Sequence, residues 1–228
     1  MHHSFQILSV RRDSSPGGTK TMTDQGIREN SPDTAAQQYR LIEEAVRRMS
    51  AVNTQAALGE AIAAEIIRYS MYDLQVIGGN MKRETDRLPS PYREKVRPYF
   101  EKQLFGTYHR LLSMHRSGAL ARRTAPITDR ETFLGYLRMV PEGCFGDTDS
   151  SGTDFYFGDP VRSLFYYLLA GFAMFVLDEP GHPVGTPFPG GFVVEKRGRE
   201  YLCPIRDKEE EVPFSICNFC PAKQMEGV

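Results

Sequence analysis

At 228 residues, 40% of them hydrophobic, the chain is long enough to bury the core of one generous domain. Its four cysteines and formal net charge of −1 exclude a disulfide-dense secreted module and a highly charged disordered protein. The first ten residues lack the apolar segment of a secretory signal, so we expect a cytoplasmic protein with reduced thiols.

Residues 1–32 are rich in Ser, Gly, Thr, Arg and Asp without a sustained hydrophobic period, which predicts a disordered tail. Met22 is an alternative start of translation within it. An amphipathic helix follows, for which Asp33 is the expected N-cap. Its apolar residues recur at helical spacing: Ala35, Tyr39, Ile42, Val46 and Met49.

The same spacing predicts two further helices. An apolar stripe that begins with Leu58, Ile62 and Ile66 indicates a second helix, which we expect to end at the glycines of 78–80. A third helix opens at Pro91, because proline is favoured at the first helical position. Its expected inward-facing residues are Tyr92, Val96, Tyr99, Phe100, Leu104, Tyr108 and Leu111.

A fourth helix is predicted where Thr128 and Glu131 have the spacing of a capping box. We expect it to end near Val140, so that residues 142–157, with Cys144, form a loop. Residues 147–154 are similar to the first part of a calcium-binding loop. However, Gly158 stands where such a loop needs a bidentate Glu, so a solvated turn is expected instead.

Residues 164–177 carry no charge and form the core of a predicted fifth helix, capped at Asp159-Pro160. A helix of that length rises about 21 Å, which is less than the roughly 30 Å hydrocarbon core of a bilayer. We therefore expect a helix that is buried on every face and no association with a membrane.

Beyond this helix the pattern changes, because proline and glycine interrupt every helical turn of 181–191. Residues 192–195 and 200–203 then read as two strands joined around Arg197-Gly198. The sequence thus predicts a mainly α protein. An antiparallel bundle of about five helices spans 33–180, and a β-hairpin with a Cys-rich metal knuckle in 181–228 packs on it.

The last three cysteines have the spacing of a metal site. Cys217 and Cys220 can bind one ion from a single turn, and Cys203 can close on the same ion. Cys144 is the expected fourth ligand, since its use leaves no cysteine over, and His182 is the alternative. Zn²⁺ and an iron–sulfur cluster both suit such ligands, and the choice stays open.

Cysteines are often simply small buried residues, but three of them within eighteen positions, two followed by Pro, favour a metal. No convincing acid/base or nucleotide-binding motif accompanies them. We therefore expect a structural metal site in a protein that binds another macromolecule. The alternative is an enzyme: an iron–sulfur redox protein, or a thiol hydrolase with Cys144 as nucleophile and His182 as base.

The charges are unevenly distributed along the chain. Residues 82–123 hold eleven Lys and Arg against four Asp and Glu, whereas 129–228 hold nine against sixteen. A basic segment of this kind indicates nucleic acid as an alternative partner. The acidic half can also pair with it inside the fold.

Residues 182–191 (HPVGTPFPGG), 201–204 (YLCP) and 217–224 (CNFCPAKQ) resemble the C-terminal signature of an uncharacterised archaeal family. This family, domain of unknown function 2115, is found mainly in methanogens. Residues 91–93 and Tyr99-Phe100 are similar to its earlier helical part, and the resemblance extends from about residue 40 to the end. It implies an anaerobic methanogen cytoplasm, where iron–sulfur proteins are common, and supplies no catalytic residues.

Overall fold

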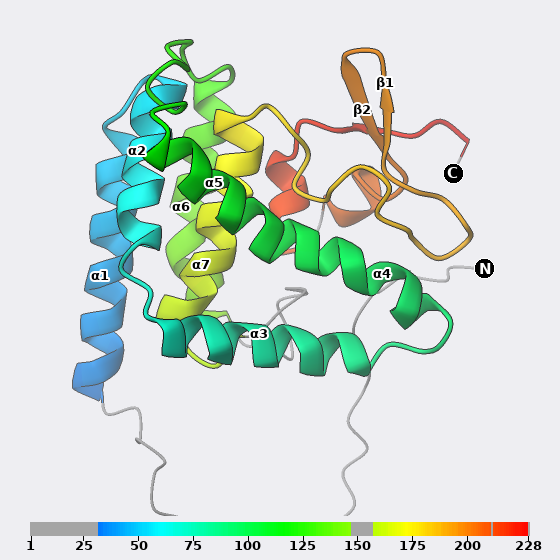
Figure 1. The fold of residues 1–228 in the computed structure, drawn as a ribbon, viewed down its shortest axis with the longest axis horizontal. Coiled ribbons are helices and arrows are strands. Elements are labelled where there is room, and N and C mark those ends of the chain that lie inside the picture. Colours follow the sequence, from blue (N-terminus) through cyan, green and yellow to red (C-terminus); the bar gives the residue numbers. More distant parts are fainter. Residues whose placement is uncertain (1–31, 147–156, 211, 228) are drawn as a thin grey trace, which may run out of the picture.

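The computed structural model describes residues 32–146, 157–210 and 212–227 (Figure 1). The expected tail and the calcium-like stretch at 147–154 therefore lie outside the described residues. Most described residues are helical, and a small sheet lies near the C-terminus.

The first helix, α1 (Pro32–Ser50), confirms the prediction from its apolar stripe. The expected N-cap is wrong, because the helix already begins at Pro32 and Asp33 lies inside it. Ile42 and Met49 of that stripe are buried, and so is the neighbouring Ala45, whereas Tyr39 is 39% exposed. The buried residues are those that face the neighbouring helices α6 and α7, against which α1 packs.

The expected second helix is wrong, because this part of the chain forms α2 (Gln55–Ile66) and α3 (Met71–Asp86). Ser70 starts the new helix with a capping box. Its hydroxyl accepts the Asp73 N–H at 3.2 Å, while the Asp73 carboxylate accepts the Ser70 N–H at 3.1 Å. This local cap outweighs the continuous apolar pattern.

The predicted end of that helix at 78–80 is also wrong, since α3 continues to Asp86. Gly78 has a packing role instead of a terminating one. A Cβ at this position would lie 3.3 Å from the ring of Phe105, so the glycine lets α3 approach its neighbour closely.

The third predicted helix is one long rod that consists of α4 (Tyr92–Glu101), a π-helical segment η1 (Lys102–Gly106) and α5 (Thr107–Arg116). In Figure 1 it runs obliquely across the front of the other helices, and α3 also lies across them. These two crossings depart from the expected antiparallel bundle.

Helix α6 (Arg130–Phe145) begins one residue later than the predicted capping box, because Asp129 is its N-cap and accepts the Thr132 N–H at 2.9 Å. It also passes through Pro141 and includes Cys144, which we expected in a loop. The extra turn is held in place by burial, since Val140, Pro141, Gly143 and Cys144 are all buried.

The buried fifth helix is confirmed as α7 (Pro160–Gly171), which continues into a π-helical segment η2 (Phe172–Val176). Asp159 caps it and accepts the Arg162 N–H at 2.9 Å. Residues 163–177 are all buried, because α1, α2 and α6 surround this helix.

The C-terminal sheet has the order β1 (Glu195–Arg197), β2 (Glu200–Cys203) and β3 (Lys223–Gln224). The predicted hairpin is correct, but its first strand starts later than expected. Residues 192 and 194 instead form backbone hydrogen bonds with 186–188. Strand β3, which pairs parallel to β2, was not predicted because two residues show no periodicity.

A second, smaller hydrophobic cluster lies under this sheet and contains Phe188, Val194, Cys203, Ile205 and Ala222. Two short 3₁₀ turns follow β2: η3 (Asp207–Glu209) and η4 (Ile216–Phe219). Turn η4 packs on α6, where the Phe219 ring lies 5.6 Å from that of Tyr136. The expected division at residue 180 stays a prediction.

Candidate functional site

The cysteines lie in different environments, and among the described residues no disulfide joins them. Cys203 belongs to the small cluster under the sheet, and Cys220 packs against both this cluster and the main core. Cys144 lies in the main helical core. Cys217 is buried on η4. The sheet and the η4 turn therefore bring Cys203 and Cys220 together.

Cys203 ends β2 and is followed by Pro204. Burial raises the pKa of its thiol to about 11, and the nearby Cys220 sulfur acts in the same direction. The backbone N–H groups of Ile205 and Arg206 donate to the Cys203 sulfur and lower its pKa, as does the positive charge of Arg206. These N–H groups stabilise the thiolate within an otherwise apolar environment.

Cys220 repeats this arrangement. Burial raises the pKa of its thiol, whereas hydrogen bonds from the backbone of Ala222 and Gly181 and the charge of Arg206 lower it. In both places a Cys-Pro pair turns the chain so that the N–H two positions after the cysteine points to its sulfur. The two cysteines thus form similar knuckles.

The side chain of Arg206 connects the two knuckles. Its Nε donates to the Cys220 carbonyl oxygen at 3.3 Å, and its Nη2 donates to the Asn218 carbonyl oxygen at 3.4 Å. Sequence reasoning missed Arg206 and the amide donors. The available signal was the repeated Cys-Pro pair at 203–204 and 220–221, which places an amide behind each sulfur.

The remaining candidate ligands flank this pair. Cys217 lies one 3₁₀ turn before Cys220, whose N–H donates to the Cys217 carbonyl oxygen at 3.2 Å. His182 is 7% exposed and follows Gly181, which donates to the Cys220 sulfur. The His182 ring packs edge-on against Phe188 at 5.9 Å between centroids. The loop before the sheet therefore carries an imidazole to the same small cluster.

Cys144 has a different environment. Burial alone raises the pKa of this thiol far above its ordinary value. The Cys144 thiol is close enough to Tyr69 and Tyr136 to influence their pKa values, which burial raises first of all. Its position in the main core separates it from the cluster that contains Cys203.

Within 32–146, 157–210 and 212–227, no three His, Cys, Asp or Glu side chains lie close enough to hold a metal ion. The convergence of four ligands expected from the sequence is thus not present in this arrangement. The elements bring together the pair Cys203 and Cys220, with Cys217 and His182 on the adjoining turns.

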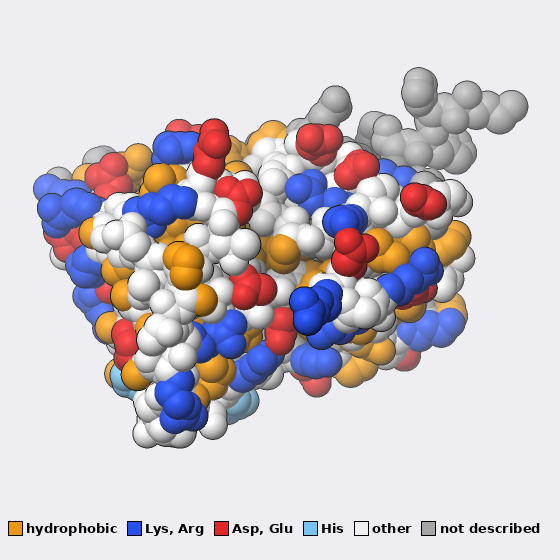
Figure 2. All heavy atoms as spheres, turned by 90° about the horizontal axis from the view of Figure 1, so that it is seen from above, with side chains coloured by type: hydrophobic (Ala, Val, Ile, Leu, Met, Phe, Trp, Pro, Cys, Tyr) orange, Lys and Arg blue, Asp and Glu red, His pale blue; other side chains and the backbone are white. Residues whose placement is uncertain are grey.

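Six of the eleven Lys and Arg in the basic segment 82–123 form ion pairs with acidic side chains. More generally, Figure 2 shows Lys and Arg interspersed with Asp and Glu on the face of the molecule seen from above. The pairing reduces the positive charge available to a polyanion, and the nucleic-acid interpretation stays a prediction. The ion pairs are Lys82–Asp86, Arg87–Glu84, Arg93–Glu94, Arg97–Asp86, Arg110–Glu179 and Arg123–Asp178.

In the part of the chain that the structure describes, none of the helices has the length and apolar character that crossing a membrane requires.

A family model described as "Uncharacterized protein conserved in archaea (DUF2115)" matches residues 54–225. The chain belongs to this archaeal family. The match covers every helix after α1 and the whole C-terminal sheet, so the resemblance found in the sequence is confirmed.

Three of its relatives, all from methanogens, show how far the similarity extends. A UPF0305 protein of Methanopyrus kandleri is 33% identical over 136 residues, which cover 60% of this chain and 86% of that protein. A UPF0305 protein of Methanocaldococcus jannaschii is 23% identical over 74% of this chain and 95% of its own length. One from Methanothermobacter thermautotrophicus is 50% identical over 22% of this chain and 32% of that protein. No solved structure gives a significant match.

Proposed function

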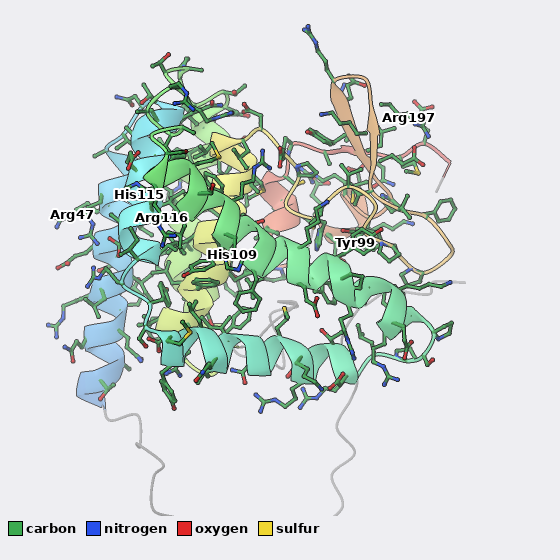
Figure 3. The ribbon with its side chains drawn as sticks, in the orientation of Figure 1. Arg47, Tyr99, His109, His115, Arg116 and Arg197 are labelled. Atoms are coloured by element: carbon green, nitrogen blue, oxygen red, sulfur yellow. The ribbon has the colours of Figure 1, made fainter. Side chains whose placement is uncertain are left out.

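We propose that the C-terminal segment binds one Zn²⁺ ion through Cys203, Cys217, Cys220 and His182. In this proposal the ion has a structural role: it fixes the sheet and η4 against α6. The tip of the β1–β2 hairpin, residues 196–200, is exposed. The ion holds this hairpin in the orientation in which its tip contacts a macromolecular partner. Figure 3 labels Arg197 on this hairpin, away from the helices.

The observation that carries the proposal is the set of amide donors aimed at two sulfur atoms. Cys203 and Cys220 each accept two backbone N–H groups and lie near one Arg. Hydrogen bonds of this kind favour a thiolate, whereas burial without a cation favours the thiol. A bound metal ion removes this conflict, because it neutralises the thiolate charge inside the apolar cluster.

Zinc is favoured over an iron–sulfur cluster by the available ligands. Three cysteines and one histidine form a common structural zinc set, while a cluster is usually held by four thiolates. The fourth thiolate would have to be that of Cys144, which lies in the helical core. Because Cys217 and His182 do not yet converge on the pair, metal binding must draw η4 and the 181–182 loop inward.

Elemental analysis of the full-length protein, purified without oxygen and under reducing conditions, tests this proposal. We expect about one zinc per chain, since a tetrahedral structural site holds a single ion. Cys203→Ser and Cys220→Ser should lose the metal, whereas the matched change Cys144→Ala should retain it. Metal-free wild-type protein that also fails to take up added Zn²⁺ would contradict the proposal. The broad visible absorption of a cluster would contradict the choice of zinc.

The alternative of a thiol hydrolase has less support. A nucleophilic cysteine needs a lowered thiol pKa and a base within hydrogen-bond reach. Burial instead raises the pKa of Cys144, and no opposing interaction accompanies it. His182, the base in this alternative, lies beside Phe188 of the small cluster, whereas Cys144 lies in the main core.

A further inference from the structure

Three exposed basic side chains, which we call the basic tip, lie within four residues at the end of the β1–β2 hairpin. Lys196 and Arg197 end β1, and Arg199 lies in the two-residue loop that leads to β2. Gly198 has a φ of +63°, the left-handed conformation that glycine provides in tight hairpin loops. The Nζ atom of Lys196 lies 5.0 Å from the centroid of the Tyr201 ring, a contact that positions this side chain and leaves its charge in place.

The hairpin projects from the rest of the molecule. Figure 1 shows β1 and β2 extending away from the helices, and Figure 3 labels Arg197 on the far side of the ribbon from them. Residues 196–200 are all exposed. Because paired strands lie only about 4.8 Å apart, a ribbon of this kind can enter a groove that the body of the protein cannot.

The basic tip keeps an excess of positive charge over the carboxylates beside it. Arg197 donates from Nε and Nη2 to Glu195 at 2.8 Å each, and its Nη1 takes no part in this pair. Glu200 pairs with Lys223 of β3 at 2.5 Å. Surface pairs of this kind are weak and exchange readily with other partners. Together with Lys223, the basic tip sets four cations against two carboxylates.

The rest of this half of the chain has the opposite charge. Residues 129–228 hold nine Lys and Arg against sixteen Asp and Glu, so a polyanion that lies flat against them is repelled. The basic tip lies three residues of β2 beyond Cys203, which is about 10 Å along a strand. Charges at that distance are largely screened at physiological salt, where the Debye length is about 8 Å. A polyanion can therefore meet the hairpin end-on.

We propose that the basic tip binds the phosphate backbone of duplex DNA, with the hairpin inserted into the major groove. The proposal rests on the proposed function, in which the tip contacts a macromolecular partner, and it gives the chemistry of that partner. The major groove is about 12 Å wide and admits a two-stranded ribbon. Phosphates line both of its edges, where Lys and Arg bind them through charge-assisted hydrogen bonds. The major groove of duplex RNA is deep and narrow, so it excludes the hairpin.

Fluorescence anisotropy of the full-length protein with a labelled DNA duplex of about two helical turns tests the proposal. The affinity should fall as salt is raised, because each phosphate contact releases counterions. Three contacts give a slope of about −2.7 for the logarithm of affinity against that of salt concentration. Duplex RNA and polyglutamate, which represents an acidic protein, should each bind about tenfold more weakly or less. Absence of salt-sensitive DNA binding, or equal binding of either competitor, would overturn the proposal.

Substitutions separate the basic tip from the basic segment of the helices. The tip variant combines Lys196→Gln, Arg197→Gln and Arg199→Gln. It should bind DNA about tenfold more weakly or less and should lose nearly all of the salt dependence, since each phosphate contact contributes about one unit of slope. The matched control removes three exposed cations of segment 82–123 and should leave affinity unchanged: Lys95→Gln, Lys102→Gln and Arg116→Gln. Equal losses in the two variants, or a loss confined to the control, would overturn the proposal.

The zinc content of the same samples distinguishes failure of this proposal from failure of the zinc site. The tip variant should retain zinc and the wild-type unfolding midpoint, because its substitutions are exposed and spare the four proposed ligands. Tip-dependent DNA binding by protein that takes up no zinc would support the basic tip and contradict the zinc site. Zinc-loaded protein whose DNA binding does not depend on the tip would overturn this proposal alone.

Discussion

At the scale of single residues, the two knuckle cysteines are buried thiols with thiolate-stabilising neighbours. The pKa of Cys203 is raised from its ordinary value of 9.0 to about 11 by burial, against the opposing effect of the N–H groups of Ile205 and Arg206. A metal ion must displace the thiol proton before it can bind. Protonation and metal binding are therefore competing states of the same sulfur.

The pH dependence of zinc affinity should reveal this competition. Because the Cys203 thiol keeps its proton up to about pH 11, the apparent affinity for Zn²⁺ should rise with each unit of pH between about 6 and 8. Zinc titrations in buffers of different ionisation enthalpy measure the protons released. Binding without proton release would show that the cysteines do not ligate the ion.

The free energy of unfolding of the metal-free protein should fall as the pH rises from about 9 to 11, in contrast to the zinc affinity, which rises with pH. A pKa raised by folding means that the folded state holds the proton more tightly than the unfolded chain. The stabilisation is therefore complete below about pH 9 and is lost as the pH rises towards 11. Urea unfolding of wild type and Cys203→Ala should differ in slope over this window, by a total of roughly 1–2 kcal/mol. Parallel curves would contradict the raised pKa.

At the scale of elements, short local interactions decide where the helices of this chain begin. The break between α2 and α3 is made by the reciprocal hydrogen bonds of Ser70 and Asp73. The apolar stripe continues across this break, which is why periodicity alone predicts one helix where the chain forms two.

Removal of the Ser70 cap should destabilise α3. We expect Ser70→Ala to lower the free energy of unfolding by about 1 kcal/mol, the usual cost of losing an N-cap hydroxyl. Chemical denaturation measures the change. Ser113→Ala, at an exposed position inside α5, is the matched control and should change stability by less than about 0.5 kcal/mol. Equal effects of the two substitutions would show that the cap does not start α3.

Two helical glycines should respond in opposite directions to substitution by alanine. A Cβ at Gly143 would lie 2.5 Å from the Tyr167 hydroxyl, so Gly143→Ala should separate α6 from α7 and cost about 1–3 kcal/mol. No atom lies within 4 Å of a Cβ at Gly79, so Gly79→Ala should stabilise α3 by about 0.4–1 kcal/mol. Thermal unfolding of the two variants measures the contrast, and a stabilising Gly143→Ala would contradict the close packing of the helices.

Prediction from the sequence succeeded where one physical signal dominates a long segment. The uncharged run at 164–177 predicts the buried α7, and apolar steps of three and four residues predict α1 and the α4–α5 rod. Prediction failed where a few local contacts determine the end of a helix. The pattern predicts a helix end near Pro141, but this residue is buried and α6 continues through it. The spacing of Cys217 and Cys220 indicates a metal site. The sequence does not show which face of α6 is buried, so it could not reveal that Cys144 lies away from these two cysteines.

At the scale of the whole molecule, the chain combines a large helical core with a small separate cluster under the C-terminal sheet. A pocket lined by residues of α1, α2, α3 and the start of α7 could not be predicted, because the residues that these four helices contribute form no sequence motif. The two clusters meet at Cys220, which packs against both. One residue earlier, Gly135 of α6 allows the Phe219 ring of η4 to approach; a Cβ at Gly135 would lie 3.2 Å from that ring.

This division predicts how the protein should respond to a chelator. The small cluster has few apolar residues of its own, so the proposed zinc site makes its order depend on the bound ion. Hydrogen exchange measured by mass spectrometry should then show faster exchange in 181–227 after chelation, while α6 and α7 stay protected. Readdition of Zn²⁺ should restore protection in wild type and in Cys144→Ala, and leave Cys220→Ser unprotected. A chelator that opened both clusters together would show instead that the ion supports the whole fold. Protection of 181–227 that never changed would show that the small cluster and its contact with α6 are sufficient without an ion.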